Sequence, residues 1–143
     1  MLILLDTNET YKNIGKINRT KASNTKNSML PVIQNKIAVS KNNRTFLIDL
    51  NSILYFYRND TKVNVITEDK AMYCVNHTLT FWEKRLLNIN FFRCQKGYLV
   101  NLEKVIEIIP YFNSTLSLKL KGCTENIPVG RTFIKKFKNL VGW

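Results

Sequence analysis

The stretch FFRCQKGYLVN, residues 91–101, holds two short runs of β-favouring residues joined by a polar turn. FFRCQ (91–95) and YLVNL (98–102) are rich in aromatic and aliphatic side chains, which suit a pleated, half-buried surface. Between them, Gln95-Lys96-Gly97 has the polar, glycine-containing character of a hairpin loop. We expect core positions at Phe91, Phe92, Tyr98, Leu99 and Val100. The stretch therefore predicts a hairpin that buries its apolar side chains and exposes a basic turn.

Runs of the same kind recur from residue 36 to residue 130. They are rich in Val, Ile, Tyr, Phe and Thr, and polar turns such as KNNR and RNDT separate them. The further predicted strands are 36–40, 45–49, 52–57, 62–67, 70–75, 105–112, 115–122 and 124–130. Long helices of the kind that cross between parallel strands are not predicted. The pattern indicates a mainly β fold of about nine or ten antiparallel strands.

Two segments have helical instead of alternating periodicity. Residues 77–88 place Leu79, Trp82, Leu86 and Leu87 on one stripe, with Glu83 and Lys84 facing outward. Asn76 or Thr78 can cap this small internal helix, and Thr80 and Glu83 have capping-box spacing. Residues 132–141 predict a basic C-terminal helix with Phe133, Phe137 and Leu140 inward.

Residues 1–35 differ from the rest of the chain. After MLILL they are rich in Asn, Thr, Lys and Ser, which bury too little surface to offset their ordering entropy. We expect a partly disordered N-terminal arm or linker here and a folded domain over 36–143. MLILL is five residues long, whereas a membrane span needs about 18. The sequence thus favours a cytoplasmic protein without a membrane partner.

The basic composition of the chain favours a polyanionic partner. The sequence holds 22 Lys and Arg against 10 Asp and Glu, a formal charge of +12 with a pI of about 9.8. From residue 36 onward there are 17 Lys and Arg against 8 Asp and Glu, a formal charge of +9. A basic solvated surface alone could produce this balance, but a pI above about 9 is typical of nucleic-acid binders.

Enzymatic chemistry finds little support. The one histidine, His77, lies near a helix start, and the five glycines are scattered and form no phosphate-binding pattern. The cysteines Cys74, Cys94 and Cys123 are too far apart for a zinc motif. Arg93 and Lys96 would favour a thiolate at Cys94, but its strand position favours a small apolar filler. We expect no catalytic residues, no metal site and no cofactor.

A family resemblance joins these features. FFRCQKGYLVN (91–101) and IPVGRTFIKKFKNL (127–140) resemble the LytTR DNA-binding domain of bacterial response regulators, with NSILYFYRNDTKVNV (51–65) and HTLTFWEKRL (77–86) at matching spacing. The resemblance covers about residues 36–143. It implies an elongated all-β fold of roughly ten strands that bends DNA and inserts loops into successive major grooves. The family commonly has histidine at the place of Gln95, serine or asparagine at Gly97, serine at Gly130 and an acidic residue at Tyr57.

The resemblance also implies which residues contact DNA. Lys96 matches the central contacting loop, Arg131 matches the arginine before the terminal helix, and 58–62 matches a third loop. Arg, Lys, Asn and Gln side chains read base edges and hold phosphates. The predicted DNA-binding residues are Arg58, Asn59, Lys62, Gln95, Lys96, Arg131, Lys135, Lys41 and Arg44. Lys96 and Arg131 are the predicted base-reading residues.

The resulting hypothesis is a transcriptional regulator without a receiver domain that binds promoter repeats in double-stranded DNA, with a second copy on tandem sites. The alternative is a protein–protein regulatory module that kept the fold but lost specific DNA binding, which the departures at Gln95 and Gly97 favour. An RNA-binding β-protein is a weaker alternative, because Tyr55, Phe56, Phe91 and Phe92 alternate like core residues.

Overall fold

Runs rich in β-branched, aliphatic and aromatic residues form ten strands in the computed structural model, which describes residues 35–143. The predictions for the N-terminal arm fall on residues 1–34, outside the described part. The strands are β1 (Lys36–Lys41), β2 (Arg44–Asp49), β3 (Ile53–Asn59), β4 (Lys62–Thr67), β5 (Met72–Val75), β6 (Phe91–Gln95), β7 (Tyr98–Asn101), β8 (Val105–Tyr111), β9 (Thr115–Leu120) and β10 (Ile127–Val129). The predicted mainly β fold is confirmed.

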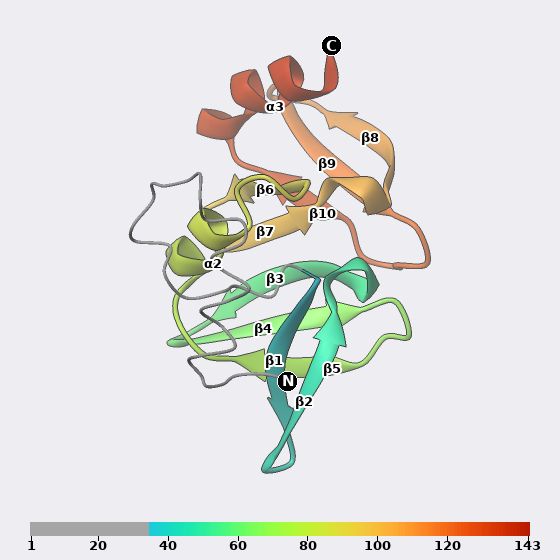
Figure 1. The fold of residues 1–143 in the computed structure, drawn as a ribbon. Coiled ribbons are helices and arrows are strands. Elements are labelled where there is room, and N and C mark those ends of the chain that lie inside the picture. The colour runs from blue at the N-terminus through green and yellow to red at the C-terminus, as the bar shows by residue number, and fades with distance from the viewer. Residues whose placement is uncertain (1–34) are drawn as a thin grey trace, which may run out of the picture. The chain divides into compact units, whose positions relative to one another are not determined.

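The strands form two antiparallel sheets (Figure 1). One has seven strands in the order β2-β1-β5-β4-β3-β7-β6, and the other has three in the order β10-β9-β8. Most sequence neighbours pair as hairpins. In two of these turns the central residues adopt positive φ, at Asn42 and Asn43 (53° and 63°) and at Asn113 and Ser114 (69° and 57°). Asn tolerates this conformation well, and in the two-residue β1–β2 turn positive φ at both positions matches the twist of the flanking strands.

Two apolar cores form on opposite faces of the strands β3, β6 and β7. Phe56 and Leu99 belong to the first, with residues of β1, β4, β5 and helix α2 (Leu79–Arg85). Phe92, Cys94 and Val100 belong to the second, with residues of the three-stranded sheet and helix α3 (Ile134–Val141). Strand alternation thus sends neighbouring side chains into different cores.

Helix α2 confirms a short internal helix and corrects its details. Thr78 is the N-cap, with its hydroxyl accepting a hydrogen bond from Phe81 N at 3.1 Å. The predicted Thr80–Glu83 capping box is absent, because Thr78 is the N-cap and Thr80 lies inside the helix, while Glu83 pairs with Arg93. Leu87, predicted inward, lies past the helix end with 71% of its surface exposed.

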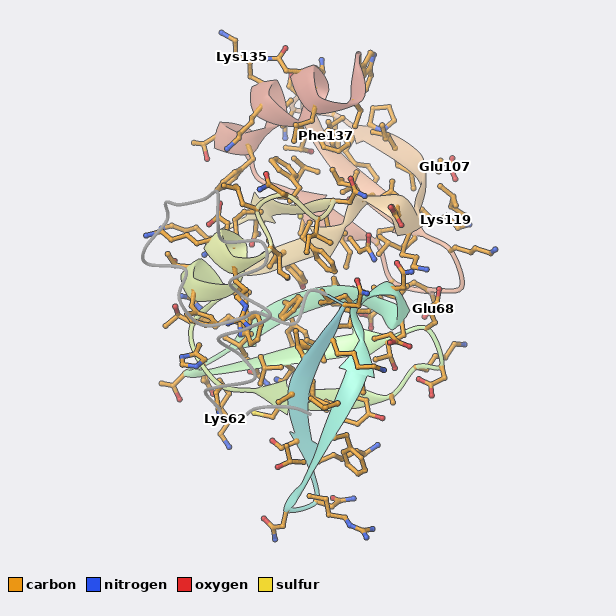
Figure 2. The ribbon with its side chains drawn as sticks, in the orientation of Figure 1. Lys62, Glu68, Glu107, Lys119, Lys135 and Phe137 are labelled. Carbon is orange, nitrogen blue, oxygen red and sulfur yellow. The ribbon has the colours of Figure 1, made fainter. Side chains whose placement is uncertain are left out.

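The C-terminal helix is shorter than predicted. A 3-10 turn, η5 (Arg131–Phe133), precedes α3, and Gly142 ends the helix in the left-handed region. Phe137 is fully buried and points from α3 toward the three-stranded sheet, whereas Lys135 lies on the outer side of the helix (Figure 2). Leu140 was predicted inward, but it is 54% exposed.

Candidate nucleic-acid interface

Three connections far apart in the sequence meet at one place: the β3–β4 turn, the β6–β7 turn and the β10–η5 connection. Arg58 N donates to Gly97 O at 2.9 Å, which joins the first turn to the second. Gly130 N donates to Cys94 O at 2.7 Å, which joins the third connection to β6. Backbone hydrogen bonds therefore hold the three together without help from the exposed side chains.

An open groove of about 400 Å³ lies where they meet. Its lining combines basic and amide side chains with two glycines, a threonine and one aromatic wall. The lining residues are Arg58, Gln95, Lys96, Gly97, Gly130, Thr132 and Phe133. Arg58, Lys96 and Thr132 are exposed, so the groove presents two cations and a hydroxyl to a ligand. It brings together three predicted site residues, Arg58, Gln95 and Lys96.

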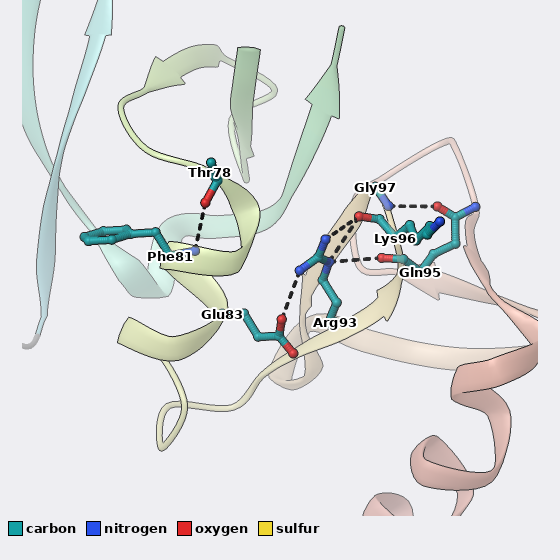
Figure 3. Close-up of polar contacts among 7 residues, drawn as sticks. All are labelled: Thr78, Phe81, Glu83, Arg93, Gln95, Lys96 and Gly97. Carbon is teal, nitrogen blue, oxygen red and sulfur yellow. Dashed lines mark hydrogen bonds and ion pairs between the residues drawn. The ribbon is translucent and has the colours of Figure 1, made fainter. Parts of the chain in front are cut away.

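Gln95 shapes the β6–β7 turn as well as lining the groove. Its side-chain Oε1 accepts a hydrogen bond from Gly97 N at 3.1 Å (Figure 3). Its Cγ also lies against Gly130, where a Cβ atom would come within 3.3 Å of it and within 3.2 Å of the Phe133 ring. The amide oxygen is thus used within the protein, and the amide nitrogen is the group left for a ligand.

Arg93 was not among the predicted site residues, yet it supports this turn. Its guanidinium donates to the backbone oxygen of Lys96 from Nη2 at 2.6 Å and from Nε at 3.1 Å, and it pairs with Glu83 of α2 at 2.9 Å (Figure 3). The Phe-Arg pair that opens the stretch 91–101 marked this position, but sequence alone could not show where the side chain points.

Arg131 lies between two groove-lining residues, Gly130 and Thr132, and its side chain is exposed. Lys135 follows four residues later on α3 and is also exposed. With these two exposed cations, η5 and α3 extend the basic character beyond the groove. Thr132 was missed because a lone threonine carries no recognisable signal.

Asn59 and Lys62 face each other across the end of the β3–β4 hairpin, next to Arg58, and both are exposed. Lys41 and Arg44 lie elsewhere, at the end of the β1–β2 hairpin. Three strands, β5, β4 and β3, separate β1 from β7 in the sheet, and the hairpin projects beyond it at the bottom of Figure 1. Lys41 instead lies over the Tyr73 ring, with Nζ 5.5 Å from its centroid. These two residues are not part of the groove.

Cys94 is an apolar filler, as its strand position favoured. It is fully buried in the second core. Desolvation raises the pKa of its thiol from 9.0 to about 12, and the nearby Arg93 only partly opposes this. Arg93 therefore does not activate the thiol.

Over residues 35–143, no group of three or more His, Cys, Asp and Glu side chains could hold a metal ion. Within the same range, every helix is too short or too polar to cross a membrane.

Known proteins with similar sequences and a similar fold agree with the architecture described above. The family model of the LytTr DNA-binding domain matches residues 43–142. A sensory transduction protein LytT of Bacillus subtilis is 37% identical over 133 residues, covering 93% of this chain and 54% of its own length. The transcriptional regulatory protein YpdB of Escherichia coli K12 is 32% identical over 105 residues, covering 73% of this chain and 43% of its own length. The chain thus spans about half the length of these relatives.

A solved LytTr DNA-binding domain of a methyl-accepting/DNA response regulator from Bacillus cereus has the same fold. It aligns with a TM-score of 0.71 at 21% identity, over 76% of this chain and 98% of that chain. This chain belongs to the LytTR family of DNA-binding domains. Its family is one of transcriptional regulators, not of enzymes.

Proposed function

We propose that this protein binds double-stranded DNA sequence-specifically and regulates transcription from promoters that carry its site. The observation that carries the proposal is the groove where three connections meet with Arg58 and Lys96 in its lining and Arg131 beside it. Loops anchored by backbone hydrogen bonds present these side chains at fixed separations. Specific recognition requires such preorganisation, whereas a diffuse basic surface gives only general affinity.

The residues around the groove have different roles in DNA binding, according to their positions. Lys96 and Arg131 read base edges, since a Lys or Arg side chain donates well to the guanine O6 and N7 atoms. Arg58, Asn59, Lys62 and Lys135 hold phosphates on either side of the groove, and Gln95 offers its amide nitrogen. Lys41 and Arg44 contact a more distant phosphate. Phosphate contacts fix the register of the protein on DNA without reading its sequence.

The wider function follows from the family. We propose that the protein acts in the cytoplasm, without catalysis or cofactor, on promoter repeats where a second copy occupies a tandem site. The relatives named above as a sensory transduction protein and a transcriptional regulatory protein support this role.

The test is selection of bound sequences from a random duplex pool by the full chain, followed by mobility shifts with the enriched sequence. We expect a defined motif to emerge within a few rounds. A pool that stays random, with no shift of any duplex, would favour the alternative of a protein-binding module that kept the fold.

A further inference from the structure

The β6–β7 turn has an unusual backbone for a short hairpin. Lys96 and Gly97 separate the last paired residues, Gln95 and Tyr98. Two-residue hairpin turns prefer types I′ and II′, which need positive φ at the first central residue. Neither Lys96 nor Gly97 has positive φ, and the register shifts between Arg93 and Gln95. The shape of this turn therefore depends on contacts from outside its own backbone.

Arg93 supplies those contacts. Besides its two hydrogen bonds to Lys96 O, its Nε lies 3.3 Å from Gln95 O, and its Nη1 donates to Glu83 Oε1. The Arg93 side chain is only 14% exposed. Each of the three guanidinium nitrogens thus has a partner within the protein, so the side chain is held in place against the turn.

Glu83 anchors the guanidinium from the other side. It belongs to α2, whose Leu79 and Trp82 are buried in the first core. A planar guanidinium held between a carboxylate and a backbone carbonyl keeps one orientation, which a lysine ammonium cannot reproduce. A helix outside the groove is in this way connected to the turn that carries Lys96.

The β6–β7 turn also positions Arg58. Gly97 O accepts the hydrogen bond from Arg58 N, so a shift of the β6–β7 turn moves a second groove residue. We propose that Arg93, held by Glu83, is a positioning residue for DNA recognition: it fixes the β6–β7 turn and thereby sets the preference for the specific site without touching DNA. This inference rests on the proposed DNA-binding function.

The first test uses a double-mutant cycle. Arg93→Lys keeps the charge and loses the planar contacts, and we expect it to weaken binding to the selected duplex by about tenfold or more while binding to a shuffled duplex changes less than about twofold. In a Lys96→Ala background the same substitution should cost clearly less than in the wild type, because one of the two side chains it positions is gone. Equal losses in both backgrounds, or on both duplexes, would overturn the proposal.

Variants of the partner and of a neighbour complete the series. Glu83→Ala should lower the preference in the same direction as Arg93→Lys, while Glu83→Gln, which keeps an acceptor oxygen, should restore part of it. Arg85→Lys is the matched control, since Arg85 is exposed on the same helix and its guanidinium lies over the Phe81 ring, 5.9 Å from the centroid. A loss from Arg85→Lys as large as that from Arg93→Lys would contradict a positioning role.

A measurement without DNA separates this inference from the proposed function. Amide hydrogen exchange of the free protein follows Arg58 N, which donates to Gly97 O. We expect Arg93→Lys to speed exchange at Arg58 by about tenfold or more while amides of β9 stay protected. Unchanged exchange at Arg58 would overturn the positioning role, whether or not the wild-type protein prefers a DNA sequence. If only that preference is missing, the proposed function fails instead.

Discussion

The Arg131 side chain is exposed next to the groove, and its backbone is part of the 3-10 turn η5. Gly130 precedes it because a Cβ there would press on Gln95 and Phe133. The backbone of Arg131 is thus fixed while its guanidinium is exposed, which suits a side chain that reads the edge of a nucleobase.

Arg131→Ala should weaken binding to the selected duplex by about 1–3 kcal/mol and relax the sequence preference at one position of the site. The measurement is fluorescence anisotropy with the selected duplex and its single-base variants. Lys119→Ala is the control, because it removes the same charge from the one exposed position of β9, which does not line the groove (Figure 2). An equal loss from both variants would assign the effect to net charge alone.

Cys94 makes stability depend on alkaline pH. Its pKa is raised from 9.0 to about 12 by burial. Above pH 9 the unfolded chain loses this proton while the folded protein keeps it, so the free energy of unfolding falls as pH rises from about 9 toward about 12. Urea unfolding at pH 8 and pH 10.5 should show a smaller decrease for Cys94→Val than for the wild type. Equal decreases would mean that the thiol ionises alike in both states.

At the scale of elements, helix α2 is short and depends on its cap and its packing. Seven residues give little intrinsic helical stability. The Thr78 hydroxyl satisfies Phe81 N, and Trp82 Nε1 donates to Asn76 O at 2.8 Å. These contacts fix the start of the helix, and Glu83 lies one turn further on.

Thr78→Ala should lower the free energy of unfolding by about 1 kcal/mol, since it removes the N-cap acceptor. Thr80→Ala is the matched control: Thr80 is exposed in the first turn and caps nothing. Chemical denaturation of both variants checks this. A larger loss of unfolding free energy from Thr80→Ala would instead support the capping box predicted from the spacing of Thr80 and Glu83.

The elements show what sequence could and could not predict. Strand alternation and Asn-rich turns were sufficient for the hairpins, because period and turn chemistry are local. The inward faces of Leu87 and Leu140 were predicted wrongly, because Leu87 lies past the end of α2 and Leu140 lies on a face of α3 that no other element within residues 35–143 covers. Helical periodicity identifies a face and says nothing about whether a partner covers it.

The candidate site was predictable only in part, for a similar reason. Arg58, Gln95 and Lys96 could each be named from polar turns and from the family resemblance, but their meeting depends on the pairing of β3 with β7 and of Gly130 with Cys94. Such contacts join residues far apart in the chain. For the same reason, the separation of Lys41 and Arg44 from the groove and the support from Arg93 became evident only from the structure.

At the scale of the whole molecule, the charge distribution predicts the salt dependence. The formal charge of +9 over residues 36–143 attracts DNA, and each phosphate contact releases counterions. The slope of log affinity against log salt should be about −0.9 per contact, and Lys62→Ala should make it shallower by about one contact. Titrations between about 50 and 200 mM salt measure this. An affinity that does not change over this range would argue against phosphate binding.

The central claim is that the groove formed by three anchored connections reads DNA sequence. The most direct measurement compares the affinity of the full chain for its selected duplex with that for a shuffled duplex of the same composition, at physiological salt. We predict a preference of about a thousandfold or more, falling by about tenfold or more in Lys96→Ala. Equal affinity for the two duplexes, or a preference that Lys96→Ala and Arg131→Ala leave intact, would contradict the claim.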